Sequence, residues 1–119
     1  MDMKFELEIT THSSRSVIAL VGDISADAGT RIRDAYDQVC RERPNAIIFD
    51  FAEVRYINSE GVAIFFSLAR NMTETSPKMV FAALNPNMQS IIKIVGLTDF
   101  VHMVSDVDAW LKESEQKQS

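Results

Sequence analysis

The feature of this sequence that most constrains its fold is the run Ala46-Ile47-Ile48-Phe49-Asp50-Phe51, which is apolar at every position except Asp50. A strand with one face in water alternates apolar and polar residues, whereas a strand covered on both faces is a continuous apolar run. Residues 46–51 therefore predict a central strand that is covered on both sides. Near the end of this strand, we expect the Asp50 carboxylate to accept hydrogen bonds from loop N–H groups.

A short polar hinge, Tyr56-Ile57-Asn58-Ser59-Glu60-Gly61, follows this strand and precedes an amphipathic helix that is expected from Val62 to about Met72. The N-terminus of a helix offers unpaired N–H groups and a partial positive charge. We therefore expect the hinge to carry the functional site, with Ser59 as its switchable side chain. Gly61 predicts either close packing at the helix start or an unusual backbone angle. Ile64 is expected towards the edge of the polar face of the helix, where it could contact a partner.

The remaining pattern alternates strands and helices. Strands are expected at 3–10, 17–21, 78–84 and 100–104, and helices at 27–42, from 85 to 96, and after 105. The short polar turn before residue 17 indicates an antiparallel hairpin, and the later strand–helix alternation predicts parallel strands joined by right-handed crossovers. The predicted fold class is α/β, with a mixed, mostly parallel sheet of about five strands and about four helices, in which the N-terminal strand is antiparallel.

Two helix boundaries have recognisable signals. Asn85 followed by Pro86 predicts a capped helix start, and Gly96 predicts its end. The segment Ser105-Asp106-Val107-Asp108 resembles a capping box for a final helix that carries Trp110 and Leu111.

Length and composition indicate one domain, expected at residues 1–112, with a polar tail at 113–119. The net charge of −5 and the lack of an arginine run argue against a nucleic-acid or anionic-membrane surface. No apolar stretch is long enough for membrane insertion, and the N-terminus has no apolar signal region. The single cysteine, Cys40, forms no internal disulfide and is interpreted as a small, partly buried residue in a cytoplasmic protein.

The motifs of common enzymes are missing. The sequence has no glycine-rich dinucleotide motif, P-loop, nucleophile elbow or HExxH motif, and neither His12 nor His102 has a partner at metal-ligand spacing. We therefore expect no catalytic residues and no metal site. A phosphoaspartate receiver shares the α/β pattern, but it requires an acidic pair where this chain has Thr10-Thr11-His12.

Three segments in register match the pattern of one known protein family. The hinge Asp50 to Gly61 takes the place of the family pattern Asp-Phe/Leu-Ser-x-Val/Leu-x-Phe/Tyr-Ile/Met-Asp-Ser-Ser/Thr-Gly. Gly22-Asp23-Ile24-Ser25 loosely matches Gly-Glu-Leu-Asp after the second strand. Asn85-Pro86 through Gly96-Leu97 matches a Pro-started helix that ends in Gly-Leu. With these three segments the chain resembles the STAS domain family, and more narrowly the free-standing bacterial anti-sigma factor antagonists. The resemblance covers residues 5–111.

The resemblance implies partner switching. In such proteins the serine after the hinge aspartate is phosphorylated by an anti-sigma factor that is also a serine kinase of the histidine-kinase-like ATPase type. The kinase supplies ATP and magnesium, so the antagonist itself needs no cofactor. The unphosphorylated antagonist binds the kinase and frees the sigma factor, and a PP2C-type phosphatase restores it. By position, the acceptor here is Ser59.

Two residues depart from the family pattern, because Asn58 replaces its aspartate and Glu60 replaces its serine or threonine. They keep open a STAS subunit that docks on a transporter ATPase or a larger regulatory complex without phosphorylation. A small enzyme or nucleotide-binding protein is disfavoured for want of a site, and a plain helix-capping role is the simpler interpretation of Ser59. The expected docking surface comprises Gly22, Asp23, Asn58, Ser59, Glu60, Gly61 and Ile64.

Overall fold

The computed structural model describes residues 4–117, with side chains described through Lys112, and it is built on one sheet of five strands. The strands stand in the order in which they occur in the chain: β1 Glu6–His12, β2 Arg15–Val21, β3 Ala46–Glu53, β4 Lys78–Ala82 and β5 Val101–Val104. β1 pairs with β2 antiparallel, and every later neighbour is parallel. The predicted mixed sheet with an antiparallel N-terminal strand is therefore confirmed.

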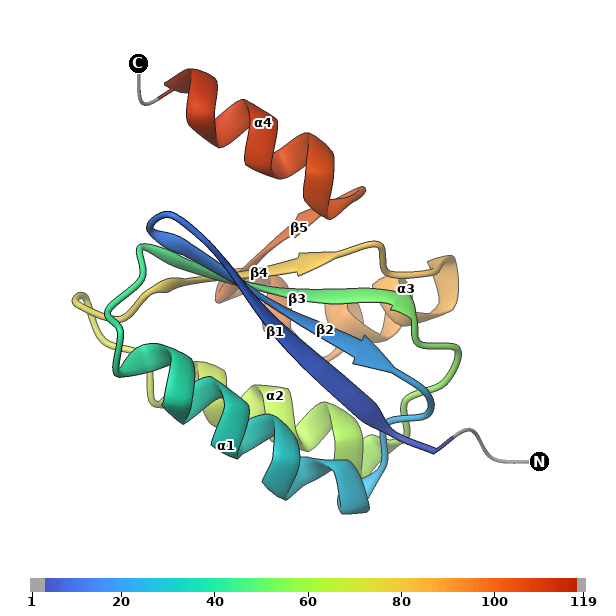
Figure 1. Ribbon diagram of the computed structural model, residues 1–119. Coiled ribbons are helices and arrows are strands. Elements are labelled where there is room, and N and C mark those ends of the chain that lie inside the picture. The colour runs from blue at the N-terminus through green and yellow to red at the C-terminus, as the bar shows by residue number, and fades with distance from the viewer. Residues whose placement is uncertain (1–3, 118–119) are drawn as a thin grey trace.

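Helices cover both faces of the sheet (Figure 1). The helical segments are η1 Ala26–Ala28, α1 Gly29–Cys40, α2 Ser59–Arg70, α3 Pro86–Ile94, η2 Leu97–Asp99 and α4 Val107–Lys117. α1 and α2 lie side by side on one face, and α4 lies on the other. α3 belongs to the first face, because Met88 and Ile92 share a buried cluster with residues of α1 and α2.

The central strand is covered on both sides, as its apolar run predicts. Phe49 points into the cluster under α1, α2 and α3, where its ring meets Phe65 edge-on at 5.2 Å and Phe81 edge-on at 6.0 Å between centroids. Ile48 points the other way, into a small cluster under Trp110 of α4. Ring pairs of this geometry contribute about 0.5–1.5 kcal/mol each beyond their area burial. β3 therefore contributes side chains to two cores of unequal size, one on each face of the sheet.

Some helix ends differ from the predicted positions. α2 begins at Ser59 and not at Val62, because the hinge itself forms the first turn. α4 begins after Asp106, whose Oδ1 accepts a hydrogen bond from the Ala109 amide at 2.7 Å, so Ser105 is not the capping residue. The predicted end at Gly96 is confirmed, since this glycine has a left-handed φ of 83°.

Two further expectations have structural outcomes. Asp50 Oδ1 accepts a hydrogen bond from the Ala52 amide at 3.0 Å. Because β3 continues to Glu53, this donor lies in the strand itself and not in the following loop, where the sequence had placed it. α4 continues to Lys117, past the expected start of the polar tail at 113, and residues 118–119 of that tail lie outside the described part of the chain.

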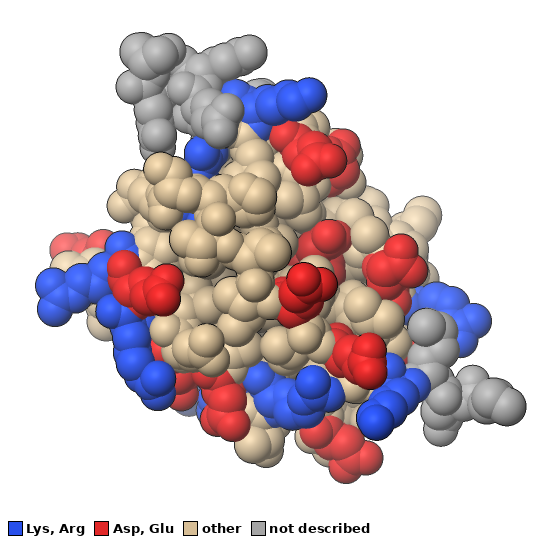
Figure 2. Space-filling model, in the orientation of Figure 1, with Lys and Arg blue, Asp and Glu red and all other residues tan. Residues whose placement is uncertain are grey.

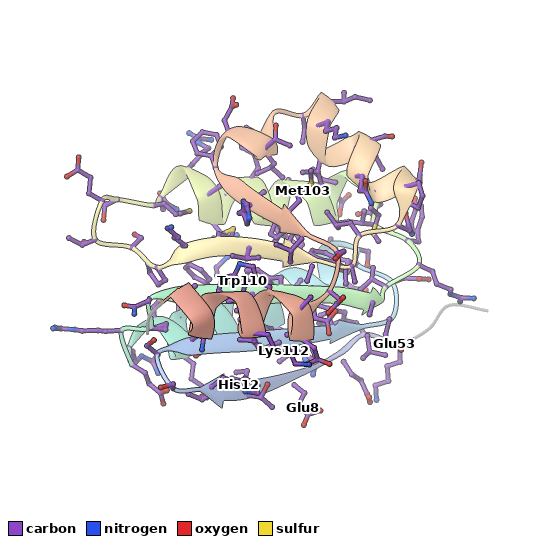
Figure 3. All side chains as sticks on the ribbon, turned by 90° about the horizontal axis from the view of Figure 1, so that it is seen from above. Glu8, His12, Glu53, Met103, Trp110 and Lys112 are labelled. Carbon is purple, nitrogen blue, oxygen red and sulfur yellow. The ribbon has the colours of Figure 1, made fainter. Side chains whose placement is uncertain are left out.

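A buried arginine fastens α4 to its face of the sheet. Arg15, at the start of β2, is only 3% exposed, and its Nη1 donates to the Leu111 carbonyl at 3.1 Å. Its guanidinium carbon lies 5.8 Å from the centroid of the Trp110 ring. Seen from above, α4 runs roughly along the strands, with His12 and Glu8 of β1 to one side of it (Figure 3). The sequence pattern had placed Arg15 in a polar turn and gave no sign of this role.

Charges of both signs are interspersed on the face shown in Figure 2, and neither sign forms a continuous patch there. Among the described residues, no helix is both long and apolar enough to cross a bilayer. Within the same residues, no three His, Cys, Asp or Glu side chains gather where they could hold a metal ion.

The side chain of Tyr36 has a raised pKa in the folded protein. Its ring stacks on Phe49 at 6.3 Å, and burial, with smaller contributions from Cys40 and Asp37, raises the pKa of Tyr36 from 10.0 to about 12. Burial also raises the pKa of the Cys40 thiol, which disfavours the reactive thiolate.

Because unfolded Tyr36 releases its proton at lower pH than folded Tyr36, the free energy of unfolding should fall as pH rises from 10 to about 12. We expect Tyr36→Phe to lack this part of the decline. Urea denaturation of both proteins across this pH range measures the difference. Parallel declines in the two proteins would show that the pKa of Tyr36 is not raised.

Candidate functional site

The hinge lies at the carboxyl end of β3, where it is joined to the loop that follows β2. Ile24 and Ile57 form an isolated parallel bridge. The Ile24 amide donates to the Tyr56 carbonyl at 3.0 Å, and the Asn58 amide donates to the Ile24 carbonyl at 3.1 Å. Gly22 and Asp23 directly precede Ile24, so this bridge brings them to the same end of the sheet as Ser59. The sequence pattern assigns these residues to one docking surface.

Gly61 lets the start of α2 pack against this bridge. A Cβ at this position would lie 2.6 Å from the Ile24 carbonyl oxygen and 2.8 Å from Ile57 Cγ1, closer than real Cβ contacts come. Gly61 is buried, and it is not among the glycines with positive φ, so close approach explains the residue. Gly22, in contrast, has a φ of 100°, a conformation that favours glycine.

Ser59 is the first residue of α2, and its side chain is exposed. The cap of the helix comes from Asn58, whose Oδ1 accepts a hydrogen bond from the Gly61 amide at 2.8 Å. The Ser59 hydroxyl makes no hydrogen bond with any described residue. Ser59 is thus not the capping residue, and its oxygen is open to solvent at the positive end of a helix.

The remaining predicted site residues differ in accessibility. Glu60 is exposed, Asp23 and Asn58 are half-buried, and Gly22 is buried like Gly61. The two glycines therefore shape the backbone of the surface, while Asp23, Asn58, Ser59 and Glu60 present side chains on it.

The expectation that Ile64 is an exposed partner contact is wrong. Its side chain is 7% exposed and belongs to the main core. The reason is α1, which packs against that side of α2: a Cβ on Gly29 would lie 3.0 Å from Ile64 Cδ1. Because Gly29 has no side chain, the two helices approach closely, and α1 covers Ile64.

Sequence reasoning missed an apolar groove that begins at the hinge. It has a volume of about 570 Å³ and lies between α2 and α3. Its lining residues are Ile57, Asn58, Ser59, Val62, Ala63, Phe66, Ser67, Arg70, Ile91 and Val95. Val62, Phe66, Ile91 and Val95 are apolar positions that the helical period assigns to the core. The available signal was the wide apolar arc of α2, which is broader than one contact with the sheet requires.

Comparison with known proteins places this arrangement in a family. Residues 6–110 match the STAS domain family over nearly the whole chain. The chain belongs to the STAS domain family. This STAS domain is 21% identical over 102 residues to an anti-sigma-B factor antagonist of Listeria monocytogenes, a match that covers 85% of this chain and 90% of the relative.

Solved structures share its fold. An anti-sigma factor antagonist from Mycobacterium paratuberculosis has a TM-score of 0.79 at 19% identity, covering 92% of this STAS domain and 93% of that chain. The anti-sigma factor antagonist SpoIIAA in its unphosphorylated form has a TM-score of 0.71 at 18% identity, covering 95% and 98%. The phosphorylated form of SpoIIAA, a Bacillus cell fate determinant, matches with a TM-score of 0.67 at 20% identity, covering 92% and 98%.

Asn58 should stabilise this STAS domain through its cap. Removing the cap in Asn58→Ala should lower the free energy of unfolding by about 1 kcal/mol. Asn58→Asp keeps an acceptor oxygen and places a negative charge at a helix N-terminus, so it should be at least as stable as the native protein. Urea denaturation measures both effects. Asn87→Ala is the control, because Asn87 is exposed in the first turn of α3 and its side chain does not cap that helix. It should change stability by less than about 0.5 kcal/mol; an equal loss in both alanine variants would contradict the capping role.

Proposed function

We propose that this STAS domain is an anti-sigma factor antagonist in a partner-switching pathway, and that phosphorylation of Ser59 controls it. The observation that carries the proposal is the exposed, uncommitted hydroxyl of Ser59 at the start of α2, at the family's acceptor position. Relatives named as anti-sigma factor antagonists support the role, and SpoIIAA has been solved in both phosphorylation states.

The unphosphorylated domain binds an anti-sigma factor that is also a serine kinase of the histidine-kinase-like ATPase type. Ser59 Oγ attacks the γ-phosphorus of kinase-bound ATP, the bond to the bridging oxygen breaks, and ADP leaves. The hydroxyl proton passes to a base on the kinase, because the neutral amide of Asn58 is not a base. The kinase also supplies magnesium. A PP2C-type phosphatase later hydrolyses the phosphoserine.

The phosphate acts at the surface and leaves the fold unchanged. It adds about −1.5 to −2 charges at pH 7. The N-terminus of α2 accommodates that charge, since its free N–H groups and dipole favour an anion. On a contact surface the same dianion must lose water, and Glu60 beside it adds a standing negative charge. Phosphorylation therefore weakens kinase binding without unfolding the domain.

The test uses purified histidine-kinase-like anti-sigma factors from the source organism, each incubated with this domain and MgATP. Intact mass and phosphosite mapping should show one phosphate, located on Ser59. Ser59→Ala should abolish it, and Ser105→Ala, an exposed serine before α4, should not. Phosphorylation should weaken binding to the kinase at least a hundredfold, which is about 2.7 kcal/mol.

Two results would contradict the proposal. One is the lack of phosphorylation at Ser59 by any of these kinases. The other is a stable partner complex that neither Ser59 phosphorylation nor Ser59→Asp weakens, which would instead favour a STAS subunit that docks constitutively on a transporter ATPase or a larger regulator.

A further inference from the structure

The groove between α2 and α3 has the dimensions of a helix-binding site. It follows α2 from Asn58 and Ser59 at one end to Arg70 at the other. At 1.5 Å per residue, the eleven steps from Ser59 to Arg70 span roughly 16 Å, or three helical turns. Apolar side chains line it between these ends: Val62, Phe66, Ile91 and Val95. Amphipathic helices dock in grooves of this kind through anchors spaced three to four residues apart.

The apolar surface continues beyond the groove. Ile94 is 83% exposed and precedes the groove residue Val95, which is 37% exposed. Phe100 is 46% exposed, and its ring packs against Phe66 at 6.4 Å. Small-molecule sites enclose most of their ligand, whereas an open groove with exposed apolar residues along its border suits a protein partner. The occupant is therefore a protein segment.

Charge at the two ends sets the direction of that segment. Arg70 is the one charged side chain among the described residues that line the groove, and it makes no hydrogen bond or ion pair with a described residue. An acidic first turn of a partner helix would pair with Arg70 and be favoured by that helix's own N-terminal dipole. The carboxyl end of the partner helix then reaches Ser59. There, the unpaired carbonyl groups of the partner helix face the positive N-terminal end of α2.

We propose that the groove binds an amphipathic helix of the anti-sigma factor kinase, antiparallel to α2, with an acidic residue at Arg70 and its carboxyl end at Ser59. This inference rests on the proposed function and deepens it. It gives phosphorylation a physical target, since a phosphate on Ser59 faces the negative carbonyl end of the bound helix. The like charges repel, and the helix leaves the groove.

The first test fills the groove. Ala63 is exposed and lines the groove, and Ala109 is also exposed but lies on α4, on the opposite face of the sheet. Ala63→Arg should weaken kinase binding at least tenfold, and Ala109→Arg should change it less than twofold. Circular dichroism and thermal unfolding check that both variants fold. Arg70→Glu gives a second probe without filling the groove, with exposed Arg41→Glu on the end of α1 as its control.

The second test maps the occupant. A photo-cross-linking amino acid at position 63 should attach to a helix of the kinase with apolar residues at every third or fourth position. Arg70→Glu should weaken binding at least tenfold. Reversing the charge of the acidic residue in the first turn of that helix should restore the affinity.

The outcomes separate the two proposals. If Ser59 is phosphorylated and binding falls with phosphorylation, but Ala63→Arg and Arg70→Glu match their controls, the proposed function stands and the groove inference is overturned. If no kinase phosphorylates or binds the native domain, both are overturned. If sedimentation shows a dimer that Ala63→Arg dissociates while kinase affinity is unchanged, the groove binds a second copy of this chain and the inference fails.

Discussion

The Gly61→Ala variant is expected to lose about 3 kcal/mol of unfolding free energy, at the upper end of the usual cost of overpacking. The added methyl would lie 2.6 Å from the Ile24 carbonyl oxygen, which is a backbone atom in the bridge between hinge and loop. That oxygen cannot rotate away as a flexible side chain would. The methyl must push α2 away from the Ile24–Ile57 bridge, so the geometry around Ser59 should change together with stability.

Gly29→Ala is the matched control for this variant. Its added methyl would meet Ile64 Cδ1 at 3.0 Å, which is the far end of a flexible side chain. Alanine is also favoured over glycine within a helix by roughly 0.8–1 kcal/mol. We therefore expect Gly29→Ala to remain within about 1 kcal/mol of the native protein. Urea denaturation compares the two variants, and equal losses would show that the Ile24 contact is not what requires glycine at position 61.

The second large effect is expected for Phe65→Ala, which should lower the free energy of unfolding by about 4 kcal/mol. Phe65 is fully buried on α2, and its ring lies 5.2 Å from that of Phe49, 5.5 Å from that of Phe51 and 5.3 Å from that of Phe81. Truncation would leave a cavity at the point where α2 contacts both β3 and β4. The neighbouring rings are held by one another, so the site cannot easily collapse.

Phe66→Ala is the internal comparison for this prediction. Phe66 follows Phe65 directly but is half-buried, lines the groove and contacts a single described ring, that of Phe100. We expect Phe66→Ala to cost about 1 kcal/mol, in the range common for point mutations. Chemical denaturation measures both variants. A loss for Phe66→Ala as large as that for Phe65→Ala would contradict the placement of the core on one side of α2.

The elements that sequence predicted well are those whose partners lie nearby or repeat with a simple period. The apolar run of β3 fixed its central position because only a two-sided environment tolerates such a strand. Asn85-Pro86 and Gly96 mark the ends of α3 because caps depend on local backbone groups. The hinge was found for the same reason, since a polar segment between a strand and a helix is visible without knowledge of tertiary contacts.

The errors at the site come from tertiary contacts that a helical period does not encode. A period separates an inner from an outer face, but α2 meets the sheet, α1 and α3 in three different directions. Ile64 therefore appeared to lie at an exposed edge, although α1 covers it. Val62 and Phe66 appeared to belong wholly to the core, although they also form the groove.

Arg15 illustrates the same limit at longer range. A buried cation requires partners that compensate for its loss of water, and one of these, the Leu111 carbonyl, lies ninety-six positions away in the sequence. Seen in its local context, Arg15 is one polar residue of a turn. Its role follows only from the position of α4 on the far face of the sheet.

The strand order β1-β2-β3-β4-β5 bears on how the protein is made. During synthesis, each strand that leaves the ribosome finds its hydrogen-bonding neighbour already outside, because no strand waits for a later one to be inserted beside it. The amino-terminal hairpin provides the first template, and every βα unit extends the edge left by the previous one. Such sequential growth keeps loop closures short, so unpaired edges are exposed only briefly to other nascent chains.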